Sequence, residues 1–80
     1  MRIHHYTAIF QKEPEGGYTV VVPALAGCVT YGETIEKAQI AAREAIESYI
    51  GSLVKDGEKI PPDINFVSTI DIQAISSSYA

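Results

Sequence analysis

The residues with the most reactive side chains in this 80-residue chain are two adjacent histidines, His4 and His5, and one cysteine, Cys28. Imidazole nitrogen and thiolate sulfur are the ligands that zinc prefers. Neighbouring side chains on a strand point to opposite faces, so the two histidines cannot readily hold one ion. Cys28 supplies no second ligand pair at zinc spacing. We therefore predict no metal site and no cofactor.

The thiol of Cys28 could act as a nucleophile only if a neighbouring base lowered its pKa, and no motif supplies that base. A lone cysteine is frequently a small core residue, which is the role we expect here. Gly27 and Gly32 do not form a phosphate-binding loop, because no Lys-Ser/Thr pair follows them and Glu33 would repel an anion. We interpret both glycines as conformational joints.

Three stretches of β-branched and aromatic residues precede one helical pattern. They predict strands at Ile3–Lys12, Tyr18–Val22 and Cys28–Tyr31. The turn residues of Glu13–Gly17 join the first two strands as a hairpin. Pro23 ends the second strand because proline has no N–H to donate.

A helix of about 20 residues is expected to follow, with Thr34 as its N-cap and Asp56-Gly57 at its end. Glu36 in the first turn complements the helix dipole. Small and apolar residues recur along it with helical period. These residues are Ile35, Ala38, Ala42, Ala45, Ile46, Tyr49 and Leu53. The alanines would let the helix lie close to a sheet.

After Pro61-Pro62, the residues Ile64, Phe66, Ile70 and Ile72 share one strand parity, which predicts a fourth strand of roughly eight residues. A right-handed crossover would place it parallel to the first strand. The expected fold class is α+β in the order β-β-β-α-β, a mainly antiparallel four-stranded sheet of order 3-2-1-4 with one helix on one face. We expect one domain over 1–80, with an ordered core at about 2–73 and a frayed tail at 74–80.

The expected strands carry apolar residues on both parities, as Tyr6 and Phe10 against Ile3 and Ile9 show. A single helix covers only one face of a sheet, so the other face should stay partly apolar. Such a surface is either an association site, giving a homo-oligomer (a dimer or higher), or a modest exposed patch of the kind that small domains carry.

The net charge of −4 and the pI near 4.9 argue against direct binding to nucleic acid, because the six cationic residues are scattered. An acidic surface suits a basic protein partner. No apolar run reaches the ~18 residues of a membrane helix. The N-terminal residues lack the apolar core of a signal peptide, and a single cysteine requires no oxidising compartment, so we expect a cytoplasmic protein.

One stretch is more specific than the rest: Pro23-Ala24-Leu25-Ala26-Gly27-Cys28-Val29-Thr30-Tyr31-Gly32-Glu33-Thr34. The pattern Pro-x-Leu-x-Gly-Cys, then Gly-x-Thr opening an Ala-rich helix, resembles the N-terminal domain of HicB-type antitoxins over roughly residues 3–72. The resemblance implies a shortened ribonuclease-H-like fold that blocks a small ribonuclease toxin of the HicA type. It assigns a structural role to the motif residues, with Cys28 packed beneath the helix. These residues are Pro23, Leu25, Gly27, Cys28, Gly32 and Thr34.

An active ribonuclease-H-like site needs several carboxylates around two metal ions, beginning on the first strand. Residues 3–10 contain no carboxylate, and Asp71 on the last expected strand would stand alone. We therefore predict that the chain is not an enzyme.

The outward face of the helix is the candidate partner-binding surface. At ~100° per residue, Glu36, Ile40, Glu44 and Glu47 point away from the apolar stripe. An apolar anchor ringed by negative charge would suit a basic toxin. The alternative is a solvated face with one stray isoleucine and the helix pairs Glu33–Lys37 and Arg43–Glu47.

The sequence thus favours an antitoxin of a toxin-antitoxin pair that binds a small basic HicA-like ribonuclease and occludes its active site. The first alternative is an orphan homo-oligomeric module of the same fold without a toxin. The second is an enzyme, either a residual nuclease or a thiol-dependent hydrolase. Many HicB-like proteins continue into a C-terminal DNA-binding domain, whereas this chain ends after the expected fourth strand, so we expect no operator binding by it.

Overall fold

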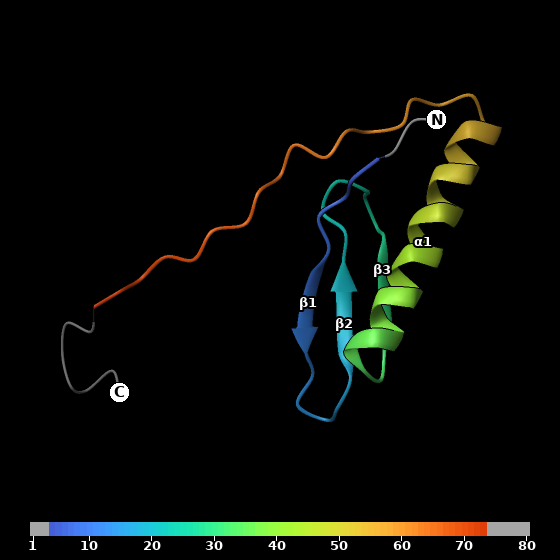
Figure 1. Ribbon diagram of the computed structural model, residues 1–80. Coiled ribbons are helices and arrows are strands. Elements are labelled where there is room, and N and C mark those ends of the chain that lie inside the picture. The colour runs from blue at the N-terminus through green and yellow to red at the C-terminus, as the bar shows by residue number, and fades with distance from the viewer. Residues whose placement is uncertain (1–3, 74–80) are drawn as a thin grey trace.

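Three short strands and one long helix form the fold of residues 4–73, the part of the chain that the computed structural model describes (Figure 1). The strands are β1 (Ile9–Lys12), β2 (Tyr18–Val21) and β3 (Val29–Gly32), and the helix is α1 (Ile35–Lys55). The sheet is antiparallel throughout, in the order β1-β2-β3. The helix covers one face of the sheet and leaves the other face open.

Helix α1 begins and ends where the sequence predicts. Thr34 is the N-cap, and its hydroxyl accepts a hydrogen bond from the N–H of Lys37 at 3.1 Å. This bond satisfies one of the free donors of the first turn. Asp56 is the C-cap, and Gly57 follows in the left-handed region with φ of 71°, a conformation that glycine adopts at little cost.

The closest contact between the two layers is at Gly32, the last residue of β3. A Cβ atom on Gly32 would overlap the backbone of Lys37 and Ala38 in the first turns of α1. Ala38 is completely buried at this contact, and Ala42, one turn further along, is buried as well. The small residues therefore set the distance between helix and sheet, and α1 lies chiefly over β3 and β2.

The core consists of two adjoining clusters between sheet and helix. One cluster centres on Val20, Ala38 and Ala42, and the other on Val22, Leu25 and Cys28. Half-buried residues in and just before β1, in β2 and in α1 complete the two clusters. They are Tyr6, Ala8, Phe10, Tyr18, Ala45, Ile46, Tyr49 and Ile50. The predicted helix stripe is confirmed in its middle, whereas Ile35 at its start is exposed.

The predicted fourth strand, and with it the sheet order 3-2-1-4, is wrong. Residues 58–73 contain no helix or strand, and the described sheet has three strands. Ile64, Phe66, Ile70 and Ile72 share a parity as the sequence indicates, but all four are exposed. Alternation shows which face a strand would bury, and it does not show that a neighbouring strand is available to pair with it.

The first strand is shorter than predicted, because β1 begins at Ile9 instead of Ile3. Ile9 pairs with Val21, so an extension of β1 would have to pair with Val22 and Pro23. The N–H of Val22 faces β3, where it is bonded to Cys28, and Pro23, the next residue that would face β1, has no N–H to donate. The ladder therefore stops at Ile9. The expected tail at 74–80 lies outside the described residues.

The contact at Gly32 predicts a clear stability difference between two glycine substitutions. Gly32→Ala should lower the free energy of unfolding by roughly 1–3 kcal/mol, because the added methyl group meets helix backbone that cannot rotate away. Gly51→Ala is the matched control within α1, where an added Cβ meets open space. It should raise stability by about 0.5–1 kcal/mol. Urea titration followed by circular dichroism measures both, and equal effects would contradict the close-packing account.

Candidate functional site

The loop between β2 and β3 is a tight turn built around two buried side chains. The N–H of Val22 donates to the carbonyl of Cys28, and the N–H of Cys28 donates to the carbonyl of Leu25, both at 3.0 Å. Gly27 takes a φ of 77°, which favours glycine and reverses the chain at this point. Leu25 is 1% exposed. The loop therefore inserts an apolar plug between the end of the sheet and the second half of α1.

Cys28 contributes to this plug, and no charged side chain among residues 4–73 shifts the pKa of its thiol. Its side chain packs in the cluster that Leu25 and Val22 form, with Tyr49 and Ile50 of α1 around it. Burial raises the pKa of its thiol, since an apolar environment disfavours the thiolate. These surroundings are those of a packing residue, and they oppose the activation that a nucleophilic cysteine requires.

An open groove of about 1080 Å³ lies between α1 and the β1 side of the sheet. Its floor is made by Tyr6, Ala8 and Phe10, which alternate along the chain and so point toward the helix layer. All three side chains are only half-buried. The groove exists because α1 lies over β3 and β2 and leaves the helix side of β1 partly uncovered.

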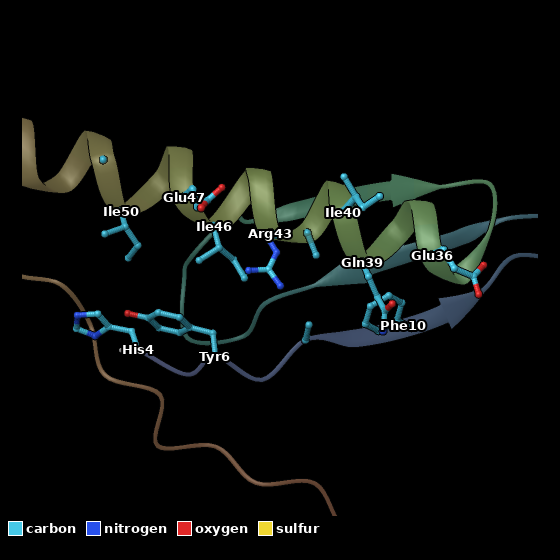
Figure 2. A pocket seen from close by; sticks show the side chains of 13 residues that line it. His4, Tyr6, Phe10, Glu36, Gln39, Ile40, Arg43, Ile46, Glu47 and Ile50 are labelled. Carbon is cyan, nitrogen blue, oxygen red and sulfur yellow. The ribbon is translucent and has the colours of Figure 1, made fainter. Parts of the chain in front are cut away.

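The wall of the groove is one side of α1. Figure 2 shows Arg43 and Ile46 pointing from the helix toward the floor, with Gln39 above Phe10 and Ile50 near His4. Ile46 and Ile50 lie toward the His4 end, whereas Gln39, Ile40 and Glu36 lie toward the Phe10 end. Apolar and polar side chains therefore alternate along the groove.

Three of the four predicted partner-binding residues line this groove. Glu36, Ile40 and Glu47 belong to its lining, whereas Glu44 is exposed and does not. Ile40 is 59% exposed and points outward from α1 in Figure 2. Ile40 thus lies on the outer face of the helix with a glutamate one turn to either side, as helical phase predicts.

Of the two side-chain ion pairs predicted along the helix, one forms and the other does not. The Nζ atom of Lys37 lies 3.8 Å from a carboxylate oxygen of Glu33, and both side chains are exposed. Arg43 and Glu47 form no ion pair among residues 4–73. The Arg43 side chain turns instead to the groove.

The groove floor was missed in the sequence analysis, although its signal is present there. One helix is about 10 Å wide and strands are spaced about 4.8 Å apart, so a helix centred on one outer strand cannot cover the other. The alanines at 38 and 42 marked the closest contact of the helix, and Gly32 marked the strand beneath it. Together these residues place the groove over β1.

The segment after α1 is attached to the start of the sheet by hydrogen bonds from two residues. The hydroxyl of Tyr6 donates to the carbonyl of Pro61 at 2.6 Å. The hydroxyl of Thr7 donates to the Asp63 carboxylate at 2.7 Å, and the N–H of Thr7 donates to the same oxygen. The N–H of Asn65 donates to the second carboxylate oxygen at 3.0 Å.

These donors change the acidity of Asp63. The hydroxyl of Thr7, followed by the backbone N–H of Asn65, stabilises the carboxylate and lowers its pKa to about 2. The folded-state pKa lies below the ordinary value near 3.9, so this attachment is fully stabilising above about pH 4 and is lost as the pH falls toward 2.

Residues 4–73 contain no group of three or more His, Cys, Asp or Glu side chains that could hold a metal ion. Within the same range, α1 is too polar to cross a membrane.

The sequence is similar to known proteins over most of its length. Residues 6–79 match the family described as HicB_like antitoxin of bacterial toxin-antitoxin system. A UPF0150 protein of Thermoplasma acidophilum is 53% identical over 58 residues, which cover 72% of this chain and 84% of the relative. A UPF0150 protein of Synechocystis is 38% identical over 71 residues, covering 89% and 90% of the two chains. A third, of Archaeoglobus fulgidus, is 33% identical over 66 residues, covering 80% of this chain and 96% of the relative.

The surroundings of Cys28 predict that its thiol reacts slowly. Its reaction with a disulfide reagent at neutral pH should be at least about 100-fold slower in the native protein than in denaturant, because the thiol is buried and its pKa is raised. A chain with Cys28→Ala and Ala26→Cys, which moves the thiol to an exposed site in the same loop, should react quickly. Fast labelling of native Cys28 would contradict a packing role.

The attachment at Asp63 predicts a residue-specific pKa change. Thr7→Val removes the hydroxyl that contributes most to the shift, so the pKa of Asp63 should rise from about 2 toward its ordinary value. Thr69→Val, which removes an exposed hydroxyl elsewhere in the same segment, should leave it unchanged. Carboxyl-detected NMR titration measures both, and an identical pKa in the two variants would show that Thr7 does not hold Asp63.

Proposed function

This chain belongs to the family of HicB-like antitoxins of bacterial toxin-antitoxin systems, and on that premise we propose that it neutralises a small HicA-like ribonuclease by binding it and covering its active site. Such an antitoxin works by stoichiometric occupation. It needs a complementary surface and no catalytic groups, and the first described residues of the chain, 4–12, contain no carboxylate. On this proposal the sheet and helix are a shortened ribonuclease-H-like domain without an active site.

The observation that carries the proposal is the exposed isoleucine on the outer face of α1. Ile40 is 59% exposed, with Glu36 one turn before it, Glu44 one turn after it and Glu47 at the groove edge. A single apolar side chain that becomes desolvated in a complex can dominate the binding energy. The surrounding carboxylates would accelerate encounter with a positively charged partner and orient it.

The charge of the chain supports the same partner. A ribonuclease binds the phosphate backbone of RNA through lysine and arginine, so its substrate-binding surface is basic. A chain with a net charge of −4 and an acidic outer helix face competes for that surface in the way that RNA does. We place this competition in the cytoplasm, where the RNA is.

A matched pair of helix variants tests the surface. The toxin to use is the small basic protein that co-purifies with the tagged chain at low salt and regains ribonuclease activity on separation. Ile40→Asp should weaken inhibition of this ribonuclease at least about 10-fold, because it places a charge in the apolar centre of the interface. Val54→Asp, at a helix residue that is 60% exposed, should inhibit like the wild type.

Titration of ribonuclease activity against antitoxin gives both the stoichiometry and the affinity. Wild type should abolish activity near one chain per toxin. Glu44→Lys should slow association, and the difference from wild type should shrink as salt is added. Equal inhibition by Ile40→Asp and Val54→Asp would show that this face of α1 does not bind the toxin. Failure to recover any toxin would reject the antitoxin hypothesis.

The open sheet face favours a second candidate, an orphan homo-oligomeric module that has no toxin. Ile9, Val21 and Val29 form one row across this face and are all exposed, with Tyr31 beside them. Recovery of this chain alone from its native cells, as a defined oligomer, would favour the module over the antitoxin.

A further inference from the structure

The segment Ile64–Ile72, here called the C-terminal arm, is extended and carries apolar side chains that contact nothing in its own chain's core. Ile64, Phe66, Ile70 and Ile72 lie on one side of it, with exposures of 72–88%. The other side is mostly polar, with Asn65, Thr69 and Asp71 beside Val67. One apolar side and one polar side are what a strand needs when one of its faces is buried.

The same chain has a sheet edge and a groove to which such a strand could bind. β1 is an outer strand of the described sheet, so the backbone groups along its outer edge are not paired within the sheet. The groove lies directly beside this edge, with Tyr6, Ala8 and Phe10 as its floor and Ile46 and Ile50 in its wall. A strand added along the edge would place every second side chain beside that floor, on the side that α1 faces.

The two surfaces match in length. The groove runs along α1 from Glu36 to Gly51, which is about 22 Å at 1.5 Å per residue. The apolar side of the arm runs from Ile64 to Ile72, which is about 26 Å at 3.3 Å per residue. The outer apolar residues of the arm could therefore occupy both ends of the groove at once.

The arm does not fill the groove of its own chain. Its base is held at the start of the sheet by the Tyr6–Pro61 and Thr7–Asp63 hydrogen bonds, and from there it runs away from β1 (Figure 1). The radius of gyration is 16.4 Å, whereas a compact chain of this length has about 12 Å. The arm thus projects far enough to reach another molecule.

We propose that the C-terminal arm of a second copy lies along the outer edge of β1 and places its apolar side chains in the groove, so that two chains exchange arms in a symmetric dimer. Exchange of identical segments satisfies both surfaces with one two-fold axis. The proposal does not rest on a toxin, because it uses only the groove and the arm of this chain.

Two double variants of the arm, which add the same charge on opposite sides of it, test the dimer. By analytical ultracentrifugation the wild type should have about twice the chain mass of 8.7 kDa. Phe66→Asp with Ile70→Asp should raise the dimer dissociation constant at least about 100-fold, since both side chains would enter the groove. Val67→Asp with Thr69→Asp, on the other side of the arm, should change it less than about 5-fold. Equal effects, or a monomeric wild type at all concentrations, would overturn the proposal.

A spin label shows where the arm lies. The label is attached at Thr69→Cys, on the side of the arm that faces away from the groove, in a chain with Cys28→Ala. This chain, which carries no ¹⁵N, is mixed with ¹⁵N-labelled wild type. Broadening of the ¹⁵N signals of residues 4–10 and of Ile46 and Ile50 is expected, because only the arm of another copy carries the label. Broadening confined to other residues, or none, would overturn arm exchange even where a dimer forms.

Discussion

The close approach of α1 to β3 at Gly32 is the contact on which the arrangement of this molecule depends. The residue at the end of β3 has no side chain, and the helix residue above it is a fully buried alanine, so the backbones meet almost directly. The position of the helix over the sheet follows from this contact. Because the helix is drawn over β3 and β2, the helix side of β1 remains open as a groove, and the outer face of α1 carries Ile40 into solvent.

The motif between β2 and β3 serves this same arrangement. Leu25 and Cys28 fill the space beneath the second half of α1, and Gly27 provides the positive φ that turns the chain between them. The short loop thus positions the helix from one end as Gly32 positions it from the other. None of its side chains faces a base or a metal ligand in the described structure, so its chemical character is that of packing.

Small size explains why so much apolar surface remains on the outside. A chain of 80 residues buries a modest fraction of its surface, and its core here consists of a few small and medium side chains. Apolar residues remain on the open sheet face, on the outer face of α1, in the groove floor and along the arm. Exposed apolar surface of this kind often marks an association site, and the chain belongs to a family of antitoxins of toxin-antitoxin systems.

Local chemistry let the sequence determine the hairpin, the third strand to within one residue, the ends of α1 and the burial of Cys28. Caps, glycine turns, proline and helical periodicity act over a few residues and leave a readable pattern. The sequence also marked Ile40 and its glutamates as outward, since helical phase alone decides that. Only the tertiary structure decided that β1 starts at Ile9, that α1 leaves β1 uncovered and that the arm lies apart from the sheet. Each of these depends on whether a partner surface is available at a distant point of the chain, and alternation within a segment carries no information about that.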